Sequence, residues 1–210
     1  MRDTKEQILL TALELFSRKG FDAVSVSDIA EKLGITKGAL YRHYASKQNI
    51  FEKILERMYQ IDAERAQQFR LPEKLFTDSP ESYRQVEWDS VASFTIAQYH
   101  FWAEDSFATG FRRMLTIEQY SREEMGQLYR SCLSQGPVAY LEDIFREMMK
   151  AGTLRQGDPG QLALVYFAPL YLLIQLSDSS QPPKEAERLL TEHMEEFRIR
   201  YATEENHESN

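Results

Sequence analysis

Apolar residues recur at helical spacing through most of the chain. In the segment 4–20, Ile8, Ala12, Leu15 and Phe16 fall on one face, at the i, i+4, i+7 and i+8 positions of an amphipathic helix. Similar patterns follow at residues 25–33, 36–44, 47–71, 83–106, 107–119, 122–135, 137–151, 159–176 and 184–202. No segment has the alternating run of β-branched residues that is typical of a strand. The pattern predicts an all-α protein of about nine or ten helices.

Capping residues define the short helices near the N-terminus. Ser25 and Asp28 have the spacing of a capping box, and Gly34 is a natural helix stop. Thr36 is a good cap for the next helix. Two short helices joined through a turn that contains glycine form a helix-turn-helix pattern. We therefore expect a three-helix domain at 1–46 with this motif at about 25–44, a larger helical domain at 47–202, and a flexible tail at 203–210.

Composition is that of an ordinary water-soluble protein. The 210 residues include 25 Lys and Arg against 33 Asp and Glu, so the net charge of −8 gives no support to nucleic-acid binding by the whole chain. The single cysteine, Cys132, cannot form an internal disulfide. The N-terminus lacks the apolar core of a signal peptide. The apolar stretch Leu162–Leu176 contains Pro169 and is shorter than the ~20 residues that span a bilayer. We expect a cytoplasmic protein with no membrane partner.

Local charge differs from the average. The 20 residues from Lys32 to Phe51 contain four cations and no acidic residue, so this window carries +4 while the rest of the chain carries −12. Such segregation is typical of a surface that faces a polyanion.

The helix expected at 36–44 has the composition that a DNA groove requires. Thr36 and Lys37 lie at its N-terminus, where free N–H groups and the helix dipole favour phosphate. Gly38 and Ala39 keep that end slim, and Ala39 could touch a thymine methyl. The alternative interpretation is structural: Leu40 and Tyr44 are core residues, and the cations form a solvated face.

The string LFSRKGFDAVSVSDIAEKLGITKGALYRHYASKQNIF resembles the DNA-binding domain of the TetR family of bacterial transcriptional regulators. The resemblance covers about residues 5–55. It implies that Val26–Leu33 and Thr36–Tyr44 are the two helices of the motif. It also implies an operator-contacting set made of Thr36, Lys37, Gly38, Tyr41, His43 and Lys47, with Lys47 on a phosphate. Arg42 occupies a variable position, where it either reads a base or faces solvent.

The rest of the chain contains no motif, but the resemblance implies a ligand-binding and dimerisation domain there. Ten aromatic residues lie between Tyr83 and Tyr129. Six of them are dense enough to line an apolar effector pocket: Phe94, Tyr99, Phe101, Trp102, Phe107 and Phe111. An ordinary aromatic core is the alternative. His100 and Glu104 alone lack the ligand count of a metal site, so we expect no metal and no cofactor.

Two C-terminal helices are candidates for a homodimer interface. The segment 159–176 is apolar all round, so one subunit is too small to cover it fully. The segment 184–202 carries an apolar stripe that includes Leu189, Leu190 and Phe197. We expect the two helices to pair with their copies across a twofold axis. Packing of both helices within one subunit is the alternative.

These observations lead to one functional hypothesis and one alternative of another class, besides a regulator that has no small-molecule ligand and is controlled by a protein partner. The hypothesis is a repressor that binds double-stranded DNA at a palindromic operator as a homodimer and is released by an unknown small-molecule effector. The alternative is a helical metabolite-binding protein or enzyme with an incidental basic N-terminus. The sequence has no phosphate-binding loop and no Ser/His/Asp or Cys/His set, so we expect no enzymatic activity.

Overall fold

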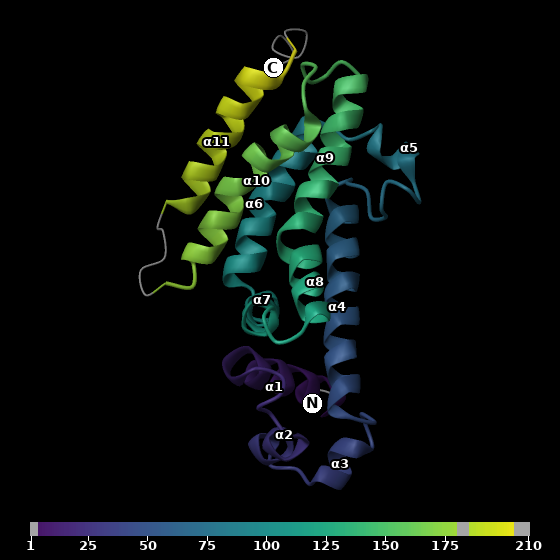
Figure 1. Cartoon of the computed structure of the whole chain (residues 1–210), viewed down its shortest axis with the longest axis vertical. Helices are drawn as coiled ribbons and strands as arrows, with labels where there is room; N and C mark the ends of the chain where they lie inside the picture. Colours follow the sequence, from purple (N-terminus) through teal and green to yellow (C-terminus); the bar gives the residue numbers. More distant parts are fainter. Residues whose placement is uncertain (1–3, 180–184, 204–210) are drawn as a thin grey trace. The chain divides into compact units, whose positions relative to one another are not determined.

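The described part of the chain is built from helices. The structure is a computed structural model that describes residues 4–179 and 185–203. Within these residues there is no strand, and the one β-bridge, between Leu154 and Ala202, is isolated. The helices, shown in Figure 1, are α1 (Thr4–Lys19), α2 (Val26–Leu33), α3 (Lys37–Tyr41), α4 (Lys47–Gln68), α5 (Pro80–Tyr83), α6 (Trp88–Glu104), α7 (Ser106–Glu118), α8 (Glu123–Leu133), α9 (Gln135–Lys150), α10 (Pro159–Leu176) and α11 (Ala186–Tyr201). The all-α prediction is confirmed.

The helix boundaries differ from the predicted ones mainly in two short elements. The helix expected at 36–44 ends at Tyr41, because the chain turns there and the amide of His43 bonds to the carbonyl of Leu40 at 2.9 Å. The segment expected as one helix at 83–106 begins instead at Trp88, and Tyr83 belongs to the four-residue helix α5. The flexible tail predicted at 203–210 lies outside the described residues apart from Thr203.

The chain divides into two compact units. Unit 1 comprises residues 1–62 and 104–130, and unit 2 comprises residues 63–103 and 131–210. The predicted helix-turn-helix domain at 1–46 is thus one part of a larger unit that also includes α7 and most of α8. Close packing explains this: a Cβ at Gly110 of α7 would lie 3.2 Å from the Leu13 side chain of α1. That residues 1–46 act as the DNA-binding domain, with a boundary at residue 46, stays a prediction.

Aromatic side chains join the helices of unit 1. The Phe21 ring lies 5.2 Å from the ring of Phe16 on α1 and 5.2 Å from the ring of Phe51 on α4. Leu40 of α3 is completely buried. Burial of large apolar groups is the main favourable contribution to folding, so Phe21 holds α1 and α4 together and Leu40 anchors α3 in the interior of unit 1.

The core of unit 2 is centred on Tyr166 of α10. Its ring makes edge contacts with Trp88 of α6, Phe145 of α9 and Phe197 of α11. Its hydroxyl lies 2.9 Å from the hydroxyl of Thr95, which satisfies two polar groups in the interior. One residue therefore ties four helices together.

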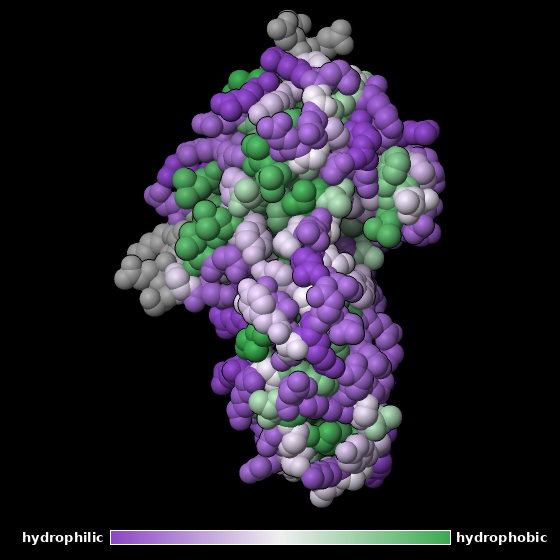
Figure 2. Space-filling view, viewed as in Figure 1, coloured by the Kyte–Doolittle hydropathy of each residue, from purple (hydrophilic) through white to green (hydrophobic). Residues whose placement is uncertain are grey.

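The opposite side of α10 is apolar and uncovered. Leu164, Val165, Ala168, Leu172 and Leu176 are exposed at helical spacing, and we call this set the α10 stripe. Figure 2 shows hydrophobic surface gathered over the part of unit 2 that contains α10 and α11. By length and composition, the 18 residues of α10 could cross a membrane, which the sequence analysis did not expect. However, its other side, including Leu162 and Tyr166, belongs to the core of unit 2.

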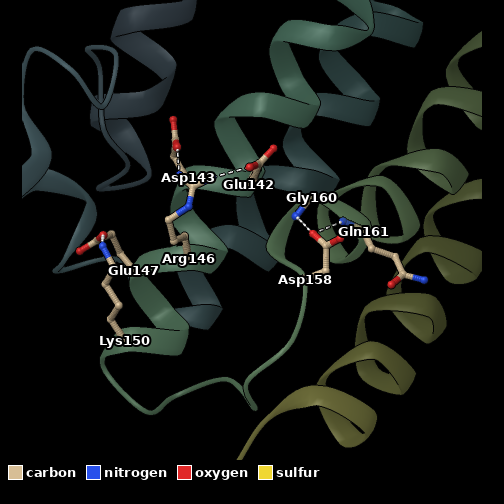
Figure 3. A network of polar contacts seen from close by, with 8 residues as sticks. All are labelled: Glu142, Asp143, Arg146, Glu147, Lys150, Asp158, Gly160 and Gln161. Atoms are coloured by element: carbon tan, nitrogen blue, oxygen red, sulfur yellow. Dashed lines mark hydrogen bonds and ion pairs between the residues drawn. The ribbon is translucent and has the colours of Figure 1, made fainter.

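Polar contacts order α9 and the start of α10. Arg146 pairs with both Glu142 and Asp143, and Lys150 bonds to Glu147 at 2.6 Å (Figure 3). Asp158 caps α10 by accepting hydrogen bonds from the amides of Gly160 and Gln161 at 2.9 and 3.2 Å (Figure 3). Pro159 occupies the first helical position, where its fixed φ is favourable. This explains why α10 begins at the predicted residue.

Alkaline pH should destabilise unit 2 through its buried tyrosines. Burial raises the pKa of Tyr83 to about 12, and its hydroxyl donates to the carbonyl of Lys74 at 2.9 Å. An unfolded tyrosine ionises near pH 10. The contribution of Tyr83 to stability is therefore complete below pH 10 and is lost as the pH rises towards 12.

The variant Tyr83→Phe tests this effect. Between pH 10 and 12, the free energy of unfolding measured in urea should fall in both proteins. The fall should be smaller in Tyr83→Phe than in the wild type, by up to about 2 kcal/mol. Tyr120→Phe is the control, because Tyr120 is 89% exposed. Parallel pH curves for Tyr83→Phe and the wild type would contradict the assignment.

Candidate nucleic-acid interface

Local hydrogen bonds define α2 and the turn that follows it. The hydroxyl of Ser25 accepts from the amide of Asp28 at 3.2 Å, and the Asp28 carboxylate accepts from the amide of Ser25 at 2.6 Å. The Ser25 hydroxyl also donates to the Asp28 carboxylate at 2.7 Å, and this bond, together with the bond from the Ser25 amide, holds the pKa of Asp28 below its ordinary value. Gly34 ends the helix with φ 67°, a conformation that glycine adopts without a steric penalty. The predicted capping box and stop are confirmed.

The N-terminus of α3 is capped but still offers donors. The hydroxyl of Thr36 accepts from the amide of Ala39 at 3.1 Å, as the sequence predicted. The amides of Lys37 and Gly38 belong to the first turn and so have no partner within the helix. The end of α3 is therefore suited to an anion, although its five residues give it only a small dipole.

The two faces of this segment separate cleanly into buried and exposed residues. Leu40 and Tyr44 are buried, and the Tyr44 hydroxyl donates to the carbonyl of Lys5 at 3.1 Å. The structural interpretation is correct for these two residues. Ala39 is half-buried. The remaining predicted contacts of the segment are exposed: Thr36, Lys37, Gly38, Tyr41, Arg42 and His43.

Gly38 has no packing role among the described residues. A Cβ at this position would have only the Thr36 hydroxyl within 4 Å, at 3.9 Å. Glycine inside a helix is about 1 kcal/mol less favourable than alanine. The absence of a side chain at Gly38 therefore does not stabilise unit 1. Its effect is that another molecule can approach the backbone of α3 closely from outside.

Two of the four cations in the basic window are engaged inside unit 1. Lys32 bonds to Glu14 at 2.6 Å, and this bond lowers the pKa of Glu14. Lys47 donates to the carbonyl of Phe21 at 2.7 Å, and its ammonium lies 4.1 Å from the centre of the Phe21 ring. Lys37 and Arg42 remain as exposed cations beside Tyr41. The phosphate contact of Lys47 stays a prediction, and the structure gives this residue an additional internal role.

The six predicted effector residues are divided between the two units. Phe94, Tyr99, Phe101 and Trp102 lie on α6 in unit 2, whereas Phe107 and Phe111 lie on α7 in unit 1. Phe111 is completely buried. On α6, Phe94 is half-buried and packs against Phe69, while Tyr99 and Trp102 are buried. The effector pocket stays a prediction.

Unit 1 contains a cavity of about 470 Å³ at the turn between α7 and α8. Its lining is mostly polar and includes none of the six aromatic residues: Gln119, Tyr120, Arg122, Glu123, Gly126, Tyr129 and Arg130. Among the described residues, no three His, Cys, Asp or Glu side chains are grouped so as to hold a metal ion. His100 instead lies 3.2 Å from Glu187.

Comparison with known proteins agrees with this geometry. Residues 8–54 match the family of bacterial regulatory proteins called the tetR family. The chain is 46% identical over 48 residues to the uncharacterized HTH-type transcriptional regulator YerO of Bacillus subtilis (strain 168), which covers 23% of this chain and 17% of YerO. It is 38% identical over 55 residues to the biofilm operon icaADBC HTH-type negative transcriptional regulator IcaR of Staphylococcus epidermidis, which covers 26% of this chain and 30% of IcaR. The chain thus spans less than a third of the length of these relatives.

The likeness in structure extends over almost the whole chain. SmeT, the repressor of the Stenotrophomonas maltophilia multidrug efflux pump SmeDEF, superimposes with a TM-score of 0.64 at 20% identity, covering 97% of this chain and 92% of SmeT. The fold and the N-terminal surface define a helix-turn-helix protein with a larger helical portion. Residues 8–54 are thus similar to the DNA-binding segment of the tetR family, and the whole chain shares its fold with SmeT.

Proposed function

We propose that this protein is a transcriptional repressor that binds double-stranded DNA through α3. The observation that carries the proposal is the exposed end of α3, where Lys37, Tyr41 and Arg42 surround a glycine that has no packing role. A slim helix end with free amides and flanking cations fits a major groove, where phosphate contacts position the protein and base edges give specificity. IcaR and SmeT, named as a negative regulator and a repressor, support repression.

A homodimer is part of this proposal. The α10 stripe leaves five apolar side chains in contact with solvent in a single subunit, and such a patch marks an interaction surface. A twofold copy of α10 would cover it. On α11, Leu190 and Phe197 are buried within their own subunit, whereas Leu189 is exposed and is the residue of the predicted stripe that would reach a partner.

Twofold symmetry determines the form of the operator. Two copies of α3 related by a twofold axis read the same bases in opposite directions, so the operator is a palindrome with half-sites separated by helical turns of DNA. A protein of this kind acts in the cytoplasm and has no enzymatic activity of its own.

A small-molecule effector releases the repressor from DNA in this proposal. SmeT, which shares the fold, has been solved in complex with triclosan. In this chain the half-buried rings of Phe94 and Phe101, with the buried Tyr99 and Trp102 on the same helix, are the candidates for contact with an effector. The effector acts only through its difference in affinity between the DNA-bound and DNA-free states, which is typically about 1–3 kcal/mol.

The decisive experiment is selection of bound sequences from a random DNA pool. We expect a palindrome to be enriched, and the same palindrome to occur near the gene that encodes the chain. Binding should weaken steeply as salt concentration rises. If no sequence is enriched and the protein does not bind random DNA at low salt, the metabolite-binding alternative replaces this proposal.

Tyr41 provides a test of the contact surface. Its side chain is 51% exposed on α3, so Tyr41→Ala should leave the melting temperature nearly unchanged. We expect operator affinity to fall about tenfold in a gel-shift titration, since a base or phosphate contact is lost in both subunits. Tyr120→Ala, which removes an exposed ring from the α7–α8 turn, serves as the matched control. Wild-type affinity for Tyr41→Ala would remove Tyr41 from the interface.

A further inference from the structure

A buried glutamate links the end of α7 to the loop before the helix-turn-helix motif. Glu118 is only 4% exposed, and its Oε1 accepts a hydrogen bond from the amide of Phe21 at 2.6 Å. Its other oxygen, Oε2, is buried without a hydrogen-bond partner among the described residues. A buried polar atom that lacks a partner is destabilising, so a residue that retains one usually has a role beyond stability.

Phe21 is also held from its other side. Its carbonyl accepts a hydrogen bond from the Lys47 ammonium at 2.7 Å, and Lys47 is the first residue of α4. The two peptide groups that flank the Phe21 Cα are thus fixed by two different helices. Because one partner is a carboxylate and the other an ammonium, both hydrogen bonds are charge-assisted and stronger than neutral ones.

Gly20 permits the approach of the carboxylate. It has φ 82°, in the left-handed region that favours glycine. A Cβ at this position would lie 2.8 Å from Oε1 of Glu118, which is closer than such atoms approach. Both the backbone conformation at residue 20 and the contact between Glu118 and Phe21 therefore depend on the absence of a side chain.

We propose that Glu118 is a positioning residue for DNA binding. By fixing Phe21 to α7 while Lys47 fixes it to α4, Glu118 sets where the chain enters α2 and, through α2, how α3 is held against α4. Loss of the carboxylate frees the loop 20–24, and α3 then samples orientations that do not fit the groove. The inference rests on the proposed function, because it assigns to Glu118 a part in DNA binding.

The experiment compares Glu118→Ala with Glu118→Gln in the full chain. Selective labelling with 15N-phenylalanine and 15N-tyrosine reports on the Phe21 and Tyr41 amides in the free protein, and fluorescence anisotropy gives affinity for the selected duplex. We expect Glu118→Ala to shift both amide signals and to weaken binding about tenfold. Glu118→Gln keeps an acceptor oxygen at the same reach, so it should restore the Tyr41 signal and keep affinity within about threefold of wild type.

A matched control separates positioning from general loss of stability. Glu147 is also 4% exposed, but it lies in unit 2 and bonds to Lys150. Glu147→Ala should therefore destabilise the fold without moving the Tyr41 signal or changing DNA affinity. An unchanged Tyr41 signal in Glu118→Ala, or wild-type affinity of that variant, overturns the inference. If the wild type binds no duplex, the proposed function fails, while the signals of the free protein still test the positioning.

A second pair of variants approaches the same contact from the other side. Gly20→Ala inserts a methyl against Oε1 of Glu118 and should reproduce the shift of the Phe21 amide and the loss of affinity. Gly152→Ala introduces the same left-handed strain, at φ 76°, where no atom lies within 4 Å of the new Cβ. It should leave both readouts as in the wild type. An effect of equal size from both variants would attribute the result to backbone strain and overturn the inference.

Discussion

Replacing both Lys37 and Arg42 with glutamine is expected to lower operator affinity about a hundredfold at moderate salt. Both side chains are exposed around the N-terminus and the end of α3, whereas Lys32 and Lys47 are engaged inside unit 1. Each cation that neutralises a phosphate releases counterions, which contributes about −0.9 to the slope of log affinity against log salt. Two cations in each of two subunits together contribute about −3.6 to the slope of log affinity against log salt.

The measurement is a series of gel-shift titrations between low and moderate salt. We expect the slope of the double variant to be shallower than that of the wild type by about three to four. A control that removes the same charge from unit 2 is Lys74→Gln with Arg200→Gln, since both residues are exposed. A wild-type slope in the double variant would show that the exposed cations of α3 do not contact phosphate.

Leu172→Glu is expected to abolish dimerisation and, with it, tight binding to the palindrome. Leu172 is 57% exposed near the middle of the α10 stripe, so glutamate is tolerated in a single subunit. In a dimer, the change removes two leucines, each of which contributes about 1.5–3 kcal/mol when buried. It also places two carboxylates in an apolar interface, and burial of an unpaired charge is strongly unfavourable.

Analytical ultracentrifugation measures the outcome directly. We expect the wild type to sediment as a dimer and Leu172→Glu as a monomer with unchanged helical circular dichroism. Leu75→Glu is the matched control, because Leu75 is 71% exposed but lies outside α10 and α11. A dimeric Leu172→Glu protein would mean that the subunits associate through another surface.

Much of the site could be predicted from single residues and short spacings. Ser25 with Asp28, Gly34 and Thr36 act within three or four residues of their partners, so they form the same bonds in almost any tertiary context. The division of the 36–44 segment into buried Leu40 and exposed Tyr41 follows from the helical period in the same way.

Other features could not be predicted from the sequence because they depend on distances in space. Aromatic density suggested one pocket, and the sequence did not show that its six residues are divided between two units, with Phe111 in unit 1 and Phe94 in unit 2. A count of charges suggested four available cations, yet Glu14 pairs with Lys32 from a different helix. Nothing in the local sequence connects Glu118 with Phe21, 97 residues away.

The sequence alone therefore determined the helices, their caps and the exposed face of α3, since these depend on hydrogen bonds and periodicity over one or two turns. Only the tertiary structure decided which cations are engaged within unit 1, which side of α10 is left apolar, and that α7 joins the N-terminal helices. Those features arise when helices pack against one another. Packing brings together side chains that are far apart along the chain, and their distance along the chain does not indicate whether they will be in contact.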